Sequence, residues 1–406
     1  MDNVTHTLIG ALVGEVAVRA VPAGSEPQAT LRRELFLPVI VVGSNLPDID
    51  LLFSFGPGGK LAYMLEHRGY THTAVGALFA SAAILAVCAF ILRRRGVALT
   101  LPDRATLVVL ALLGPSLHLA LDYLNSYGVH PWWPFDDRWI YGDSLFIVEP
   151  LYWASCAPLA WLSRSRAARA SVGLALAAGL YLAVVTPMVG RASTLAYAAL
   201  TLALLAVGRF ATTAVALAVA LAAVLMTTAT FALAGHEADR VVGASAAATW
   251  ADWTTRDRVL TPRPMNPFCW DAIVVQDRAD RYALRRGVAM LSPLATRACV
   301  AAVSTRSTAP MQKLDRDGGS AVHWRDEFVG SRTQLRSLAA HSCVVSAFLR
   351  FARTPWVGEA PSQVVGDLRF DRGPELGFAE LDLAVPPPCP RYVPPWVPPR
   401  ADLLLP

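Results

Sequence analysis

The sequence predicts a mostly α-helical protein, a polytopic bundle of transmembrane helices followed by a small β-rich domain outside the cytoplasm. Three observations lead to this fold class. Of the 406 residues, 54% are hydrophobic and 17% are charged, whereas soluble domains carry roughly 25% charged residues. Several apolar runs approach the roughly 20 residues that a membrane helix needs. After Ala234 the apolar character ends, and a polar region continues to the last residue.

The first two apolar segments, residues 4–18 and 35–46, are short for membrane helices. At about 1.5 Å per residue neither crosses a hydrocarbon core of roughly 30 Å comfortably, so we expect thin or half-buried helices shielded by others. No positive region precedes the first segment, which we therefore expect to be retained and not cleaved. The stronger candidates for membrane helices are residues 73–92, 105–125, 145–162, 172–189, 194–207 and 210–234.

The arginines indicate how these helices are oriented. Short cytoplasmic loops of membrane proteins collect Lys and Arg. Placing the arginines of residues 19–33, 93–104, 164–169 and 209 inside the cell leaves few basic residues in the outer loops. Alternate threading then puts the N-terminus, the polar C-terminal region and the acids and histidines discussed below on the outer face. The chain has no dense basic tract with interleaved aromatic residues, so we expect no nucleic-acid partner.

We predict three parts of the chain: a membrane-embedded metal-site domain (1–162), additional transmembrane helices (163–235), and a soluble extracytoplasmic domain (236–406). Within the last part, short runs bounded by Gly and Pro are typical of strands; they are residues 272–275, 282–284, 344–351 and 364–370. Residues 386–399 are rich in proline and should form an extended tail. The four cysteines of this part could form disulfides outside the cytoplasm, with three possible pairings.

His118 and Asp122 are the polar residues that most strongly indicate function. They lie inside an apolar run, and four-residue spacing places both side chains on one face of a helix, about a turn apart. That arrangement suits two ligands of one metal ion or of neighbouring ions. A helix-to-helix hydrogen bond is the structural alternative. Ionisable residues within a membrane helix cost several kcal/mol and are therefore functional candidates by default.

Other segments supply similar groups to the same predicted face. Asp2 and His6 repeat the four-residue spacing, although Asp2 could simply cap a helix. Asp48 and Asp50 follow Pro47 in a predicted turn. His67 and His72 flank the entrance to the next apolar run, with Arg68 between them. Because independent segments deliver His and Asp to one side of the membrane, we expect a shared metal site.

The order of these motifs resembles the YdjM-like inner-membrane proteins, a family catalogued as membrane-bound metal-dependent hydrolases. The resemblance covers about residues 1–155, with Glu149-Pro150 where Asp-Pro is expected. A later segment, Asn266-Pro267-Phe268-Cys269-Trp270, is similar to one in longer members. The motifs are Asp2-x-x-x-His6, Pro47-Asp48-x-Asp50, His67-Arg68-Gly-x-Thr71-His72, His118-x-x-x-Asp122, Tyr127-Gly128-Val129, Pro134-Phe135 and Asp143. The ligand pattern is also similar, by analogy alone, to that of zinc-dependent phospholipases C.

The resemblance and the residues together predict a hydrolase in the bacterial inner membrane. Mixed imidazole and carboxylate ligands suit one to three divalent ions, Zn²⁺ first. A site at the outer membrane boundary suits a lipid or lipid-linked phosphoester as substrate. The expected metal ligands are Asp2, His6, Asp48, His67, His72, His118 and Asp122. The residues expected to serve catalysis are Arg68, Asp50 and Asp143, with Arg68 either holding a phosphate or anchoring the membrane interface.

Two other classes of function remain open at the level of sequence. An ion-coupled transporter could use Glu149, His118 and Asp122 as a proton or cation relay, although such residues would be expected nearer the middle of the membrane and in more helices. A non-enzymatic envelope protein could hold a structural metal and bind a protein partner through its C-terminal domain.

Overall fold

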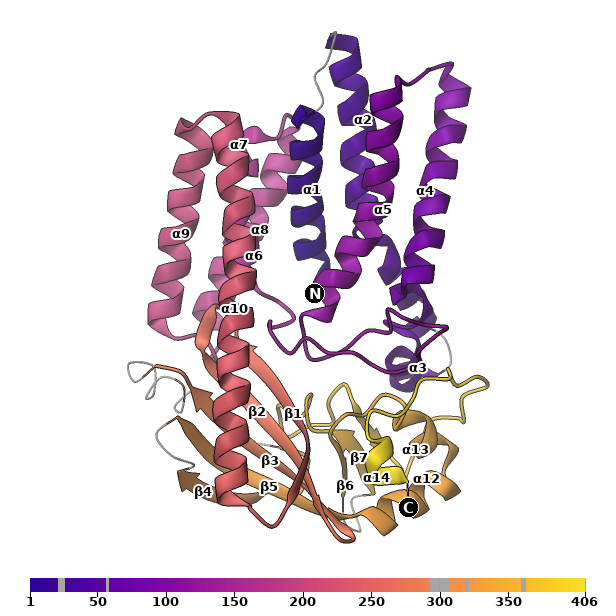
Figure 1. Cartoon of the computed structure of the whole chain (residues 1–406), viewed down its shortest axis with the longest axis vertical. Helices are drawn as coiled ribbons and strands as arrows, with labels where there is room; N and C mark the ends of the chain where they lie inside the picture. The colour runs from indigo at the N-terminus through magenta and orange to yellow at the C-terminus, as the bar shows by residue number, and fades with distance from the viewer. Residues whose placement is uncertain are drawn as a thin grey trace. The chain divides into compact units, whose positions relative to one another are not determined.

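The structure is a computed structural model that describes residues 1–20, 26–55, 58–292, 299, 307–317, 321–358 and 363–405 (Figure 1). The chain divides into two compact units. The first comprises residues 1–49, 70–133 and 145–230, and the second comprises residues 50–69, 134–144 and 231–406. The three-part division predicted from composition stays a prediction.

The first unit consists of helices, and Figure 1 shows α1, α2, α5 and α4 packed in that order. The helices that lie wholly in this unit, with the short 3-10 turn η2, are α1 (Asn3–Ala20), α2 (Glu26–Gly43), η2 (Tyr70–His72), α4 (Ala74–Arg95), α5 (Leu101–Tyr123), α6 (Pro150–Ser155), α7 (Leu159–Leu162), α8 (Arg166–Val185) and α9 (Arg191–Phe210). The 3-10 helix η1 (Leu46–Phe55) and the helix α10 (Thr213–Thr249) continue from this unit into the second.

Five helices of the described chain are long and apolar enough to cross a membrane: α4, α5, α8, α9 and α10. The bent pair formed by residues 28–43 and 46–52, with a 49° break, would make a sixth. Large apolar side chains such as Leu78 and Phe79 of α4 are exposed, as expected for a surface in contact with lipid. Together with its composition, these helices make the chain a membrane protein.

Local chemistry sets the ends of the helices that carry the polar residues. Thr73 caps α4 by accepting a hydrogen bond from Gly76 N, and Gly96 ends that helix with a left-handed φ of 64°. Thr100 caps α5 in the same way through Asp103 N. Such caps satisfy backbone groups that the first and last turns leave open. α5 continues from this cap through Pro115 to Tyr123, so His118 and Asp122 lie on successive turns of one helix.

Two of the expected helix bounds were wrong. Residues 145–162 do not form one helix, because α6 ends at Ser155 and α7 starts only at Leu159. α7 begins directly after Pro158, whose ring and missing N–H make it unfavourable inside a helix. In contrast, α10 does not end at residue 234 but extends to Thr249, for a total of 37 residues. Its polar last part stays helical because three of its apolar side chains, spaced four residues apart, are buried: Ala238, Val242 and Ala246.

The second unit contains the predicted β-structure. A five-stranded antiparallel sheet has the order β1-β2-β3-β5-β4, and a three-stranded sheet has the order β6-β7-β8. The strands are β1 (Thr254–Arg263), β2 (Asn266–Arg278), β3 (Arg281–Met290), β4 (Gln312–Asp317), β5 (Val322–Ser331), β6 (Pro355–Val357), β7 (Val364–Asp367) and β8 (Glu380–Asp382). Its short helices are α3 (Gly59–Glu66), α12 (Arg332–His341), α13 (Cys343–Phe348) and α14 (Ala401–Leu404).

The expected strand segments 272–275 and 282–284 lie in β2 and β3. Of the segment 364–370, only residues 364–367 form a strand, β7, and residues 344–351 contain the helix α13. Ser342 caps this helix by accepting a hydrogen bond from Val345 N, so a local cap prevails over the β propensity of the valines. Disulfides join Cys269 to Cys299 and Cys343 to Cys389. Residues 386–399 contain no helix or strand. Trp396 within them is fully buried, and its Nε1 donates to Leu65 O at 3.1 Å.

Candidate metal centre

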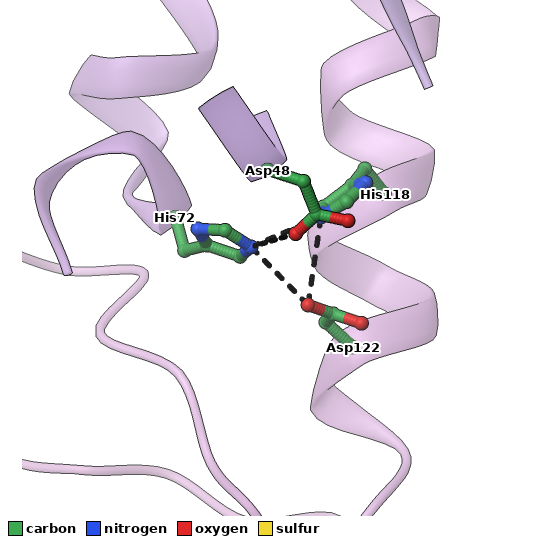
Figure 2. A group of neighbouring side chains, drawn as sticks. All are labelled: Asp48, His72, His118 and Asp122. Atoms are coloured by element: carbon green, nitrogen blue, oxygen red, sulfur yellow. Dashed lines mark hydrogen bonds and ion pairs between the residues drawn. The ribbon is translucent and has the colours of Figure 1, made fainter. Parts of the chain in front are cut away.

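Four side chains of the first unit converge on one point (Figure 2). Asp48 comes from η1, His72 from η2, and His118 and Asp122 from successive turns of α5. His118 and His72 are fully buried, Asp122 is 1% exposed and Asp48 is 9% exposed. The predicted four-residue spacing on α5 therefore does place two candidate ligands on one side of a shared centre.

Five of the six distances among the four ligand atoms are close to the edges of a metal tetrahedron, and all four atoms lie within 4.8 Å of one another. The two Nε2 atoms of His72 and His118 lie 3.0 Å apart. Asp48 Oδ1 lies 3.4 Å from each of them, and Asp122 Oδ2 lies 3.2 Å from His72 Nε2 and 3.5 Å from His118 Nε2. Ligands about 2.0–2.2 Å from a tetrahedral Zn²⁺ are separated by about 3.3 Å, so the spacing fits an ion of this kind.

The hydrogen bonds behind the ligands support the same conclusion. His118 Nδ1 lies 2.8 Å from Ser44 O. Because a carbonyl oxygen can only accept a hydrogen bond, Nδ1 carries a proton, and in the neutral form of the ring Nε2 therefore carries a lone pair. That lone pair faces two carboxylate oxygens. A lone pair and two carboxylate oxygens repel one another unless a cation or a proton lies among them. Histidine ligands of metals commonly donate the N–H of their other ring nitrogen to a carbonyl or carboxylate, as His118 does to Ser44 O.

The two candidate ligands that lie outside α5, His72 and Asp48, are also oriented by hydrogen bonds with neighbouring side chains. His72 Nδ1 lies 3.0 Å from Thr71 Oγ1, and Asp48 Oδ2 accepts a hydrogen bond from Asn3 Nδ2 at 2.9 Å. Ser44 and Asn3 were not among the predicted site residues. Ser44 acts through its backbone carbonyl, which no side-chain pattern can reveal. Asn3 lies within the Asp2-x-x-x-His6 motif, in which only the acid and the histidine were considered as ligands.

Close approach of two helices places the Ser44 carbonyl against His118. Gly43 of α2 and Gly114 of α5 face each other, and a Cβ on Gly114 would lie 2.9 Å from Gly43 Cα and 3.1 Å from Ser44 N. Only glycine permits this approach of the two backbones. α2 ends at Gly43, so the carbonyl of Ser44 is available to the histidine because no further turn of helix uses it.

The N-terminal motif divides into two roles. His6 is fully buried, stacks on His118 with ring centroids 3.9 Å apart, and places its Nε2 3.3 Å from Asp122 Oδ1. Its Nδ1 is buried and has no hydrogen-bond partner among the described groups. Asp2 instead accepts hydrogen bonds from Thr5 N at 2.9 Å and Thr5 Oγ1 at 2.6 Å, the pattern of a helix cap. The amino group of Met1 contacts Asp122.

Three other predicted site residues lie together in the second unit. Asp50 Oδ1 lies 3.0 Å from His67 Nδ1, and Asp50 Oδ2 accepts a hydrogen bond from Arg68 N at 3.0 Å. Arg68 is 1% exposed and has a positive φ of 61°, a conformation that costs energy for a bulky residue. The carboxylate of Asp50 thus fixes both the imidazole of His67 and the unusual backbone of Arg68.

Asp143, the last predicted residue, also belongs to the second unit and pairs there with Arg353. Arg353 Nη1 donates to its carboxylate at 2.9 Å. Burial raises the pKa of Asp143 to about 6, against the opposing effect of the Arg353 charge. Its φ is positive at 46°. The ion pair ties the segment 134–144 to the C-terminal part of the same unit.

Comparison with known proteins finds a matching protein family for the part of the chain that contains this site. Residues 1–192 match the family model described as YdjM inner membrane protein. This confirms the family resemblance that the motifs indicated for about residues 1–155. A relative, the uncharacterized protein YfhP of Bacillus subtilis (strain 168), is 29% identical over 155 residues, which make up 38% of this chain and 44% of the relative. No solved structure matches the chain significantly.

The YdjM match contains all four residues of the candidate centre and also His6, Asp50, His67 and Arg68. The YdjM family and the cluster of Asp and His side chains therefore describe a membrane protein with a possible site for a divalent metal ion. The C-terminal sheet lies beyond the matched residues.

Proposed function

We propose that the protein is a membrane-bound, metal-dependent hydrolase of the bacterial inner membrane. We propose as its substrate a lipid or lipid-linked phosphoester at the outer face. The observation that carries this proposal is the tetrahedral spacing of two imidazole nitrogens and two carboxylate oxygens in a buried cluster. Two His and two Asp ligands suit Zn²⁺, which when bound would supply an acidified water and stabilise charge on a phosphoryl oxygen.

The chain's own residues would share the remaining work. His72, His118, Asp48 and Asp122 would hold the ion, with Ser44 O fixing the tautomer of His118. His6, stacked on His118 and adjacent to Asp122, is proposed as a further ligand or as the group that orients Asp122. Roles in catalysis for Asp50, His67, Arg68 and Asp143, and ligation by Asp2, stay predictions.

Charge and cysteine chemistry support the proposed side of the membrane. The clustered arginines at the end of α4 and at the start of α8 favour the cytoplasm for those loops. When α1 and the broken α6–α7 segment are counted as further crossings, alternate threading from these loops favours the outside for the N-terminus and the C-terminal sheet. The two disulfides support this proposal, since disulfides persist in oxidising compartments. An envelope protein that binds the C-terminal domain is a further proposed partner.

Metal content tests the site. Full-length protein purified in detergent is expected to retain at least one divalent ion per chain, counted by elemental mass spectrometry, because burial and pre-oriented ligands slow its loss. His72→Ala and Asp122→Ala should lose this metal. His341→Ala is the matched control, because His341 is exposed and, among the described residues, bonds only to Ser337 O in its own helix. Metal-free wild-type protein, or unchanged metal in both ligand variants, would refute the site.

Turnover tests the reaction separately. Phosphoester hydrolysis on a panel of phospholipids in mixed micelles should fall below detection after chelation and return with Zn²⁺ or Mn²⁺. Bound metal without turnover on any lipid would contradict the hydrolase and favour a structural metal. Counterflow in proteoliposomes without hydrolysis would favour a transporter instead.

A further inference from the structure

A cluster of arginine side chains lies on the five-stranded sheet of the second unit, outside the residues that match the YdjM family. Arg263 at the end of β1 is 1% exposed and Arg286 of β3 is 7% exposed. Arg325 of β5 has a side chain that is 16% exposed. Buried guanidinium groups are costly unless carboxylates or bound anions compensate them.

A β-bulge brings Arg325 into this cluster. Arg286 faces Asp326 across β3 and β5, whereas the next residue of β3, Gly287, faces Trp324. Arg325 is the extra residue of β5 at this point. A bulge turns a side chain away from the regular alternation of the strand and is common beside functional sites.

The carboxylates near the cluster are already engaged. Asp326 accepts two hydrogen bonds from Arg286, at 2.7 Å and 3.0 Å, so it forms a bidentate pair with that residue. Arg325 Nη2 lies 3.9 Å from Asp326 Oδ2, which is too long for a hydrogen bond. Asp271 Oδ1 lies 3.6 Å from Arg263 Nη2. Neither distance therefore gives Arg325 a hydrogen-bonded carboxylate.

Arg325 is the member with unused hydrogen-bonding capacity. Its Nε atom is buried and has no hydrogen-bond partner among the residues that the structure describes. Burial lowers the pKa of Arg325, and although the charge of Asp326 raises this pKa, the charge of nearby Arg286 lowers it further. The opposite face of the same sheet differs, because there Arg285 pairs with Glu327 at 2.9 Å and lies over the Trp250 ring at 4.2 Å.

We propose that Arg263, Arg286 and Arg325 form a binding site for a phosphate-type oxyanion. A phosphate carries up to two negative charges and several acceptor oxygens, which match guanidinium forks from different strands. Such a ligand would offset the buried positive charge of Arg325 and accept its Nε–H. The anion is either free phosphate or the phosphate of a lipid headgroup. This proposal does not rest on the proposed hydrolase function.

The test measures thermal unfolding of full-length protein in detergent with inorganic phosphate, against chloride at equal ionic strength. Phosphate should raise the Tm of the wild type in a saturable manner. Arg325→Gln should weaken the apparent phosphate affinity at least tenfold, because it removes a charge-assisted contact. Arg278→Gln is the control, since Arg278 is an exposed arginine of the same sheet, and it should bind phosphate as the wild type does.

A second measurement separates a ligand site from a structural ion pair. In chloride alone, Arg325→Gln should unfold at the same temperature as the wild type or higher, because it removes an uncompensated buried charge. Arg325→Lys, which keeps the charge and loses the planar fork, should show intermediate phosphate affinity. A lower Tm for Arg325→Gln in chloride, equal effects of phosphate and chloride, or unchanged phosphate affinity would each overturn the proposal. If phosphate bound at the metal centre instead, Arg325→Gln would leave the apparent phosphate affinity unchanged, and this result would also overturn the proposal.

The source of the anion is decided in lipid nanodiscs. If the headgroup of an anionic phospholipid is the ligand, phosphatidylglycerol discs should abolish the phosphate-dependent rise in Tm, and Arg325→Gln should lose the stabilisation by that lipid. If free phosphate is the ligand, the rise in Tm should be the same in phosphatidylglycerol and phosphatidylcholine discs. Either result supports the oxyanion site, and phosphate insensitivity in both discs without any lipid effect contradicts it.

Discussion

At the scale of single residues, Arg353 shows how the second unit holds two carboxylates around one guanidinium group. It donates to Asp143 at 2.9 Å and to Asp257 at 2.8 Å and 3.0 Å, and it lies over the Tyr141 ring at 3.9 Å. Although burial alone would raise the pKa of Asp257, the charge and hydrogen bonds of Arg353 lower it to about 2. Burial prevails at Asp143, whose pKa rises to about 6.

This difference predicts a pH dependence of stability. Between about pH 4 and pH 6 the folded protein keeps a proton on Asp143 that the unfolded chain releases, so this residue makes stability fall as pH rises through that window. The slope approaches about 1.4 kcal/mol per pH unit. Asp257 acts in the opposite sense below pH 4, where its stabilising charge is lost as pH falls. Asp143→Asn should remove the decline between pH 4 and pH 6, measured as Tm against pH, and parallel curves for variant and wild type would contradict the assignment.

The sequence predicted which side chains meet in the candidate metal centre better than it predicted their hydrogen bonds. Spacing alone indicated that His118 and Asp122 share a helix face, because helix geometry fixes that relation. It could not separate Asp2 from His6, since a cap and a ligand need the same kind of residue at a helix start. The part played by Ser44 was beyond prediction because a backbone carbonyl is common to every residue type.

At the scale of elements, the crossing of α2 and α5 at Gly43 and Gly114 supports the centre. Gly114→Ala would add a methyl group against backbone atoms that cannot rotate away, at 2.9 Å from Gly43 Cα. The helices would separate and Ser44 O would retreat from His118. We expect a loss of about 1–3 kcal/mol in stability and a metal affinity lower by about 10–100-fold, as for other partners of ligand histidines.

Gly173→Ala is the matched control for Gly114→Ala. Gly173 lies in α8, where an added Cβ would meet no atom within 4 Å, so alanine should be neutral or raise the Tm slightly. The measurements are Tm in detergent and a competition titration with a metal chelator. Equal behaviour of the two variants would show that the helix crossing does not position the ligand.

The elements that were predicted wrongly share one physical cause. Apolar content predicts that a segment is buried, and residue propensity predicts its favoured conformation. Neither predicts which groups will form hydrogen bonds with the backbone at the ends of the segment. Pro158 divides the apolar run at 145–162, and Ser342 starts a helix in a run that resembles a strand. Conversely, α10 passes through a change of composition because one side of its last turns is still buried.

At the scale of the whole molecule, the proposed topology makes the cysteines informative. Four cysteines form two disulfides in the second unit, whereas Cys88 and Cys156 are free and buried in the first. If the C-terminal sheet folds outside the cytoplasm, it meets oxidising conditions that keep both bonds closed. A reducing cytoplasm would leave all the cysteines as thiols.

Counting thiols on protein isolated without reductant tests this topology. After denaturation, we expect only the two free cysteines, Cys88 and Cys156, to react with a maleimide, as read by intact mass, and the four others to react only after reduction. Cys343→Ser should release its partner Cys389 and add one reactive thiol, which checks the pairing. All six reacting without reduction would place the C-terminal sheet in the cytoplasm. That result would also remove the argument for a site at the outer face, because α10 connects the helices to the sheet in a single continuous span.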